Sequence, residues 1–338
     1  MSILNISKKL RKSLKTMSIF NTGVSLFKKT KVVPVFLTIT DDYAKYAGAC
    51  INSLMKHTNP ERNYRVIVMY DRLSLKNRIR LRNLVTRNCA IEFHKMKYNL
   101  YMQIIVRYCA KRSGSGDFFA RPVYYYRAFI ARMFLQYDKG IYIDSDTILM
   151  GDIGELFDIE LGEDVIAARP DPKVANVPEF VEYVEKALGV PHRNYVNSGV
   201  LLMDLKKLRK LHYITKMTDL IKEDADLVAP DQDYLNVILK GKIKHLGREW
   251  NCQPEGENVK GAKLLHFNLS KKPWYHDDVN QGELFWEAAK GTGFTGDLMR
   301  EKESYTPEMA EVSARQIRAL IEKAAGLAQT PEPLLRTK

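Results

Sequence analysis

The sequence predicts an α/β protein with a mostly parallel central sheet and helices on both of its faces. Apolar runs of strand character alternate with helix-like segments along residues 32–94. This alternation is typical of parallel sheets, because the crossover between two parallel strands is usually a helix. A later apolar run, at 140–143, ends abruptly in two carboxylates. Ligands collect at the carboxyl ends of parallel strands, so this run also indicates where a site would lie.

The first half of the chain supplies three strands and two helices. A buried strand is expected at residues 32–40, and Asp41 and Asp42 then open a helix that runs to about 56. A second strand at 64–70 precedes a helix whose inner face should carry four apolar side chains, Leu75, Ile79, Leu81 and Leu84. A third, shorter strand is expected at 90–94.

The later elements are more widely spaced. Residues 111–118, rich in Gly, Ser and basic side chains, indicate a mobile loop before a helix at about 123–135. The fourth strand is the run at 140–143, and the core continues with a strand at 164–168 and the stretch 195–204. After Trp274 the order weakens until a polar helix at about 307–325.

We expect three parts: a basic amphipathic extension (residues 1–31), a globular domain (32–275) and a helical C-terminal appendage with a tail (276–338). The extension carries eight Lys or Arg and no Asp or Glu, with apolar residues at helix-like intervals between them. Such a helix can lie on an anionic membrane surface. A disordered solubilising tail would have the same composition.

Charge and composition narrow the range of partners. The formal net charge of the 338-residue chain is +13, which favours anionic partners such as nucleic acid, an acidic membrane or phosphorylated small molecules. The four cysteines are scattered and indicate buried thiols in a reducing compartment. No apolar run is long enough to span a bilayer, and no signal-peptide pattern is present. The sequence thus predicts a cytoplasmic protein, and the basic extension offers a means of peripheral attachment to the inner face of the cytoplasmic membrane.

Asp-x-Asp patterns occur three times, and their positions distinguish them. Asp224 and Asp226 follow charged residues, as expected of a solvated surface, and a further pair stands at Asp231 and Asp233. Asp144 and Asp146 follow a buried strand directly, where two carboxylates can reach one Mg²⁺ or Mn²⁺ whose shell is completed by phosphate oxygens. A turn that merely ends the strand is the alternative.

Two other classes of function compete. Haloacid-dehalogenase-like phosphatases also end a strand in Asp-x-Asp and would use Asp144 and Asp146. They place the motif on the first strand and want Thr or Val where this chain has Ile148. A basic nucleic-acid-binding protein is the second alternative. The excess charge is concentrated in residues 1–31, however, and no aromatic-rich basic groove is evident, so we expect no nucleic-acid partner.

Four segments together resemble the family-8 retaining glycosyltransferases, which include bacterial lipopolysaccharide galactosyl- and glucosyltransferases and glycogenin. They are Tyr-Ile-Asp-Ser-Asp at 142–146, Asn-Ser-Gly-Val-Leu-Leu-Met-Asp at 197–204, Pro-Asp-Gln-Asp at 230–233 and His-Phe-Asn-Leu-Ser-Lys-Lys-Pro-Trp at 266–274. The resemblance implies a GT-A nucleotide-sugar-binding fold. It also implies transfer of glucose or galactose from a UDP-sugar to a hydroxyl of a saccharide, glycolipid or glycoprotein acceptor, with retention of configuration. A cell-surface glycan or lipid-linked precursor is the expected acceptor.

The resemblance assigns roles to particular residues. Asp144, Asp146 and His266 would bind the Mn²⁺ or Mg²⁺ ion, with Ser145 between the two carboxylates and Lys272 on the diphosphate. The uridine would lie at Thr38, Thr40, Asp42 and Tyr43, although Tyr43 is equally well explained as a core aromatic. The donor sugar and its diphosphate would meet Arg127, and the transferred sugar would meet Asn197, Asp231 and Gln232. Asp171, on the acceptor side, stands between two prolines and is equally suited to shaping a turn.

One departure from the family pattern concerns Leu269, which stands where the family usually has Gly in the last motif. Gly allows the backbone to approach a ligand closely. We therefore expect Leu269 to alter the path of the loop around the diphosphate.

Overall fold

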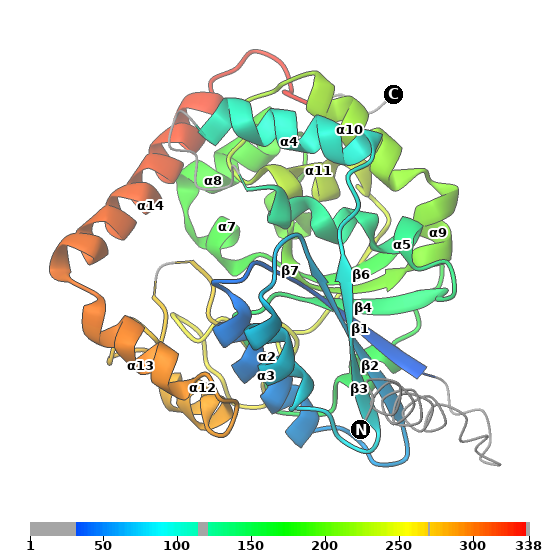
Figure 1. Cartoon of the computed structure of the whole chain (residues 1–338). Coiled ribbons are helices and arrows are strands. Elements are labelled where there is room, and N and C mark those ends of the chain that lie inside the picture. Colours follow the sequence, from blue (N-terminus) through cyan, green and yellow to red (C-terminus); the bar gives the residue numbers. More distant parts are fainter. Residues whose placement is uncertain (1–31, 114–120, 270, 336–338) are drawn as a thin grey trace, which may run out of the picture. The chain divides into compact units, whose positions relative to one another are not determined.

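The main sheet of the computed structural model, which describes residues 32–113, 121–269 and 271–335, has seven strands in the order β3-β2-β1-β4-β7-β6-β8 (Figure 1). Only β7 runs antiparallel to its neighbours β4 and β6; the other pairings are parallel. The predicted mostly parallel sheet is confirmed. The strands are β1 (Val32–Ile39), β2 (Asn63–Tyr70), β3 (Cys89–Lys95), β4 (Lys139–Ile143), β6 (Ile166–Pro170), β7 (Val196–Asp204) and β8 (Ile243–His245).

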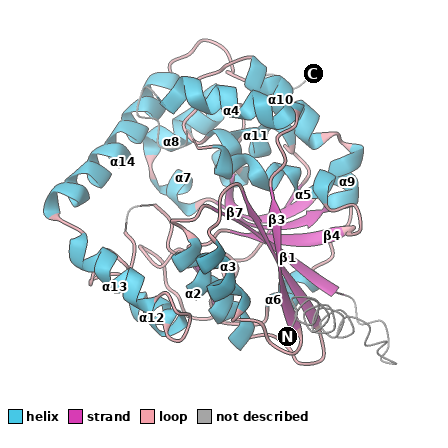
Figure 2. Cartoon of the chain, viewed as in Figure 1, coloured by secondary structure: helices cyan, strands magenta, loops and turns pink. Residues whose placement is uncertain are grey.

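Helices cover both faces of this sheet, as Figure 2 shows. Alternate side chains of β1 point to opposite faces, since successive residues of a strand do so. Phe36 packs in a cluster with residues of α4, α10 and α11, whereas Val35 and Leu37 pack in a second cluster with residues of α2 and of α12 (Gly282–Ala289). The helices of the first two-thirds of the chain are α2 (Ala44–Lys56), α3 (Leu75–Arg82), α4 (Leu100–Ser113), α5 (Ile130–Met133), α6 (Ile153–Asp158), α7 (Pro172–Asn176), α8 (Pro178–Glu182), α9 (Leu205–Lys210), α10 (Tyr213–Lys222) and α11 (Pro230–Ile238).

A second, two-stranded antiparallel sheet matters more for function. It pairs β5 (Thr147–Leu149) with β9 (Leu264–His266), and Thr147 lies opposite His266. The pairing brings His266 close to the end of β4, although β4 ends about 120 positions earlier in the sequence.

The expected inner face of α3 is wrong. Leu81 is fully buried, but Leu75 and Ile79 are 65% and 51% exposed. At 100° per residue, Leu81 lies roughly 160° around the helix from Ile79, so the two cannot share one face. Leu81 and Leu73, which precedes the helix, face the core, and Leu84, which follows the helix, is half-buried against it.

Two other expectations need correction. The helix expected at 123–135 is a 3₁₀ helix, η1 (Pro122–Phe129), followed by the short α5. Order does not weaken after Trp274, because α12 (Gly282–Ala289) and α13 (Thr295–Ser304) follow it. The expected polar helix is α14 (Pro307–Leu327), where the Thr306 hydroxyl accepts a hydrogen bond from the amide of Met309 at 3.3 Å.

Short irregular helices complete the chain: the π-helix η2 (Tyr183–Ala187) and the 3₁₀ helix η3 (His192–Asn194). All four cysteines are buried, as expected. Among the described residues, no helix is both long and apolar enough to cross a bilayer. The basic extension (1–31) and most of the loop expected at 111–118 lie outside the described residues.

Candidate functional site

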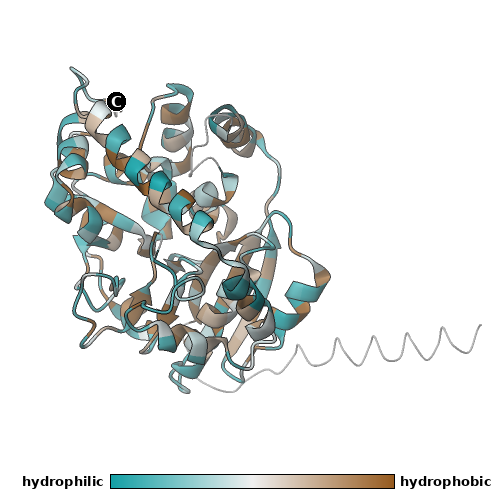
Figure 3. Ribbon diagram, turned by 90° about the vertical axis from the view of Figure 1, so that its left-hand side faces the viewer, coloured by the Kyte–Doolittle hydropathy of each residue, from teal (hydrophilic) through white to brown (hydrophobic). Residues whose placement is uncertain are grey.

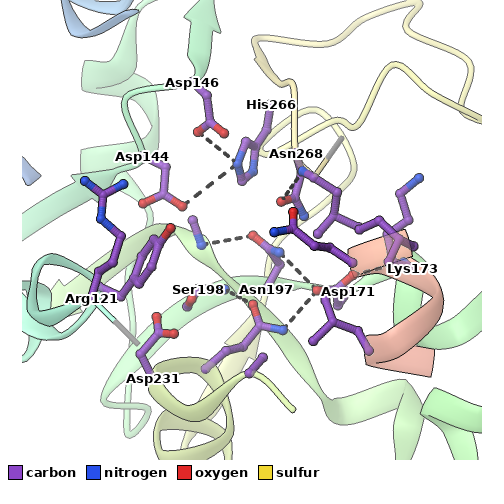
Figure 4. A pocket seen from close by; sticks show the side chains of 18 of the residues that line it. Arg121, Asp144, Asp146, Asp171, Lys173, Asn197, Ser198, Asp231, His266 and Asn268 are labelled. Carbon is purple, nitrogen blue, oxygen red and sulfur yellow. Dashed lines mark hydrogen bonds and ion pairs between the residues drawn. The ribbon is translucent and has the colours of Figure 1, made fainter. Parts of the chain in front are cut away.

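A pocket of about 610 Å³ opens at the carboxyl ends of β1 and β4. Its lining includes the ends of both strands, part of β7, the start of α11, and one side of α14. The close view in Figure 4 shows carboxylate, amide, imidazole and guanidinium groups converging here. The sequence placed the site at the same edge of the sheet.

Asp144, Asp146 and His266 form a compact cluster in this pocket. Nε2 of His266 lies 3.2 Å from Oδ1 of Asp146 and 3.9 Å from Oδ2 of Asp144. One ligand atom of each residue lies within 4.8 Å of the other two. Two carboxylates and one imidazole are a suitable donor set for Mn²⁺ or Mg²⁺, with further positions left for substrate oxygens.

Two backbone features hold the cluster together. The amide of Asp144 donates to the carbonyl of Gly199 at 2.8 Å, and the amide of Phe267 donates to the carbonyl of Asp146 at 3.0 Å. Gly199 also leaves room for the side chains. A Cβ atom at this position would lie 2.8 Å from Oδ2 of Asp144 and 2.9 Å from Nδ1 of His266, and closer still to Cε1.

Asn251 sets the tautomer of His266. The Oδ1 atom of Asn197 accepts from the Gly199 amide at 2.9 Å, so it is an oxygen, and the amide nitrogen of Asn251 donates to it at 2.9 Å. The Oδ1 atom of Asn251 therefore faces Nδ1 of His266 at 2.7 Å and accepts its proton. Nε2, which faces the carboxylates, is then the ring nitrogen left to bind a metal.

Arg127 links Asp144 to Asp231. Its Nη2 atom lies 3.1 Å from Oδ1 of Asp144 and 3.5 Å from Oδ2 of Asp231, and its guanidinium lies 4.5 Å from the centroid of the Tyr142 ring. It also donates to the backbone and the hydroxyl of Ser198. Arg127 is thus a fixed positive charge between two carboxylates, in a buried position.

The pKa values of Asp231 and Asp146 are shifted in opposite directions. Burial raises the pKa of Asp231 to about 6; the charge of Arg127 opposes this effect and that of Asp144 adds to it. Burial alone would also raise the pKa of Asp146, but the charges of Lys272, at 2.6 Å, and His266 outweigh it and hold this pKa well below its usual range. Asp146 is therefore available as an anionic ligand.

Asp171, Asn197 and Gln232 meet on the other side of the pocket. Oδ2 of Asp171 accepts from the amide groups of Asn197 at 3.0 Å and Gln232 at 3.1 Å. The Oε1 atom of Gln232 accepts from the Ser198 amide at 2.9 Å. Asp171 also caps α7 through the amide of Lys173, so its two interpretations, a site residue and a turn residue, both hold geometrically.

The residues expected at the uridine are only partly brought together. Thr38, Thr40 and Tyr43 line the pocket, and Tyr43 packs edge-on against Tyr46 with ring centroids 5.1 Å apart. Ser145, between the two carboxylates, lines the pocket as well. Asp42 is exposed, lies outside the pocket lining and faces Arg121 at 3.5 Å.

Leu269 has a left-handed backbone conformation, with φ of 62°. This is the conformation that Gly adopts without cost and that a bulky residue adopts at about 1–3 kcal/mol. The backbone at Leu269 therefore has a conformation typical of Gly although the side chain differs, and Leu269 lines the pocket.

Several residues in and around the pocket were not predicted from the sequence. Asn251 acts through His266 rather than on a ligand, and its positive φ of 71° is a structural signal that no sequence periodicity reveals. Gly199 lies within a recognised motif, but its steric role depends on a neighbour 67 positions later. The contribution of α14 to the wall could not be predicted from its polar composition. Asp224 and Asp226, in contrast, are exposed as expected.

This sheet order, with the site at the ends of β1 and β4, is that of the GT-A fold. The sequence model of Glycosyl transferase family 8 matches residues 34–278, and the chain belongs to that family.

Individual relatives are more distant. The chain is 25% identical over 271 residues to general stress protein A of Bacillus subtilis (strain 168), an alignment that covers 73% of this chain and 89% of that protein. It is 31% identical over 169 residues to the lipopolysaccharide 1,2-glucosyltransferase of Escherichia coli (strain K12), covering 45% and 48% respectively.

Solved structures share the fold. The galactosyltransferase LgtC, solved with donor and acceptor sugar analogues, superposes with a TM-score of 0.57 at 21% identity, over 83% of this chain and all of that one. The bifunctional glycosyltransferase WbbM gives 0.66 at 23% identity, over 82% of this chain and 53% of that one. This chain therefore corresponds to about half of WbbM.

Proposed function

We propose that this glycosyltransferase moves a hexose, glucose or galactose, from a UDP-sugar to an acceptor hydroxyl with retention of configuration. The observation that carries the proposal is the Asp144, Asp146 and His266 cluster, with Nε2 of His266 turned towards both carboxylates. A bound Mn²⁺ or Mg²⁺ would neutralise charge on the diphosphate and so favour the departure of UDP.

Different pocket residues would bind the uridine and the diphosphate of the donor. Thr38, Thr40 and Tyr43 line the end of the pocket proposed for uridine. Lys272, whose ammonium group lies beside the cluster, would contact the diphosphate as charge accumulates on it. The same charge would be met by Arg127, which is held by Ser198 and so needs little reorganisation.

Asn197, Asp231 and Gln232 would surround the transferred sugar. Both ends of the Gln232 amide are occupied, because Oε1 accepts from Ser198 and Nε2 donates to Asp171. An amide is a poor nucleophile, and the hydrogen bond to Oε1 weakens it further. We therefore propose attack by the acceptor from the face that UDP leaves, with the departing phosphate as the base. A double displacement through Asp231 is the other route to retention.

The acceptor and the cellular location are also part of the proposal. A saccharide on a cell-surface glycan or lipid-linked precursor agrees with the similarity to a lipopolysaccharide glucosyltransferase. An enzyme that works on such a precursor would act on the cytoplasmic side of the membrane. Residues 1–31, with eight cationic side chains, would keep it near that surface.

A screen of UDP-sugars for hydrolysis without acceptor tests the reaction class. We expect one UDP-hexose to be cleaved, with the activity lost in chelator and restored by Mn²⁺ or Mg²⁺. Asp146→Asn should lower the rate at least about a hundredfold. Asp224→Asn serves as the matched control, because Asp224 and Asp226 have the same Asp-x-Asp spacing but are exposed; this variant should keep the wild-type rate. Full activity in chelator would contradict the proposal.

A further inference from the structure

The helix α14 is fixed at both ends across the pocket. Just before it, the ring of Tyr305 stacks on that of Tyr275, with centroids 4.3 Å apart. Near its other end, Nζ of Lys323 donates to the carbonyl of Leu227 at 2.6 Å and pairs with Asp226 at 2.7 Å. The middle of α14, about residues 309–320, lies between these anchors and lines the pocket.

This middle section presents an apolar side that is incompletely covered by the protein. Met309, Val312 and Leu320 follow one another at intervals that keep them on one side of a helix, and all three line the pocket. Two polar residues of the same side, Ser313 and Gln316, line it between them. Met309 and Val312 remain 48% and 46% exposed although the helix carrying them is anchored. Figure 3 shows hydrophobic and hydrophilic residues alternating along this helix.

The pocket wall next to this helix is also apolar. It includes Val174 of α7, Phe180 of α8 and Val184 of η2, and both α8 and η2 pack against α14. We call the part of the pocket lined by these residues and by Met309, Val312 and Leu320 the α14 groove.

The α14 groove is continuous with the catalytic end of the pocket. Asp171 and Lys173, at the start of α7, lie between the groove and Asn197, and Figure 4 shows Lys173 beside the neighbouring helix. A molecule whose hydroxyl reaches the donor sugar would therefore have its other end against α14.

We propose that the α14 groove binds the aliphatic chain of a lipid-linked saccharide acceptor. The inference rests on the proposed function, because it places the acceptor relative to the donor. Saccharides are held by hydrogen bonds and aromatic faces, whereas Val, Leu and Met side chains outnumber the polar Ser313 and Gln316 and the single Phe180 in this groove. The whole pocket, catalytic end included, measures about 610 Å³, so the groove suits part of a small molecule rather than a folded partner. From Met309 to Leu320 the helix rises roughly 16 Å, enough to lie along a medium-length alkyl chain.

Alkyl glucosides test the groove without knowledge of the natural acceptor. Binding of hexyl, octyl and decyl glucoside to the full chain is measured by calorimetry, below their micelle concentrations. We expect the dissociation constant to fall by up to about fourfold for each added methylene that enters the groove.

The double variant M309Q/V312T keeps similar shapes but makes the wall polar, and it should flatten the dependence on chain length. Met299→Gln is the matched control. Met299 is an equally exposed methionine, 53% accessible, on α13 and outside the pocket lining, so this variant should keep the wild-type dependence.

Two results would overturn the inference: no binding at any chain length, or the same chain-length dependence in M309Q/V312T as in the wild type. UDP-sugar hydrolysis without acceptor is measured on the same preparations. If the wild type does not hydrolyse any UDP-sugar, the proposed function is refuted. If it does, and M309Q/V312T keeps the wild-type dependence on alkyl chain length, only the lipid groove is refuted.

Discussion

Replacing Gly199 with alanine tests how the proposed cation site is built. The new methyl carbon would lie 2.8 Å from Oδ2 of Asp144 and 2.9 Å from Nδ1 of His266. Non-bonded carbon contacts are normally about 3.5–4.0 Å, so the imidazole would have to move by roughly 1 Å. Metal–ligand distances tolerate only about ±0.2 Å. The variant should therefore lose metal affinity by at least the 10–100-fold typical of displaced supporting groups.

The same substitution also introduces packing strain, which needs a separate control. Gly140 lies on β4, at the end of the strand away from the site. Gly140→Ala places a methyl carbon 2.7 Å from Cε2 of Phe36. Both variants should lose about 1–3 kcal/mol of unfolding free energy, as overpacked cores do. Only Gly199→Ala should also weaken Mn²⁺ binding, measured by electron paramagnetic resonance of the free ion. Equal Mn²⁺ affinity in the two variants would refute this account of the site.

Four further predictions concern the network, the sugar site, pH and the membrane. Asn251→Gly suits the positive φ and should weaken Mn²⁺ binding about 10–100-fold by releasing His266, with little change in thermal stability; unchanged affinity would show that the tautomer needs no support. Gln232→Ala should lower kcat more than UDP affinity, and NMR should show an α-linked product from an α-linked donor; a β-linked product would contradict retention. Burial raises the pKa of Asp231 to about 6 from 3.8, so the unfolded chain loses this proton first as pH rises, and the stability that the group contributes below pH 3.8 is lost by about pH 6. Asp231→Asn should therefore gain stability relative to the wild type across that window, by up to about 3 kcal/mol in denaturant titrations, and a pH-independent difference would oppose this. Finally, the full chain should sediment with phosphatidylglycerol vesicles and residues 32–338 should not; half of the eight cations alone would give only about millimolar binding, so apolar burial must add to it.

The strands were predictable because they are continuous apolar runs with few competing interpretations. The runs at 32–40, 64–70 and 140–143 correspond to β1, β2 and β4 within about a residue at each end. The face of α3 was not predictable from apolar content, because its leucines and isoleucine point in different directions and only the tertiary contacts select Leu81. Helix α12 was missed although it is apolar, because Gly and charged residues interrupt the sequence around it.

The site was predictable where chemistry and position coincide. Asp144 and Asp146 could be distinguished from two other Asp-x-Asp pairs because they follow a buried strand. His266 came from a motif rather than from any local property. Asn251 could not be predicted, because its role depends on one hydrogen bond to His266 and one to Asn197, neither of which leaves a pattern in the sequence.

Hydrogen-bond polarity gives Asp171 an influence beyond its own contacts. A carboxylate can only accept, so Asn197 must turn its amino group to Asp171 and its oxygen to Asn251. Asn251 must then present its own oxygen to His266. The direction of each bond fixes the next, and the proton on Nδ1 of His266 is thus set by a charge three residues away along this chain of contacts. Asp171→Asn, which can donate as well as accept, would leave the amide of Gly199 as the remaining group that orients Asn197, and its effect would be seen at the cation rather than at the acceptor.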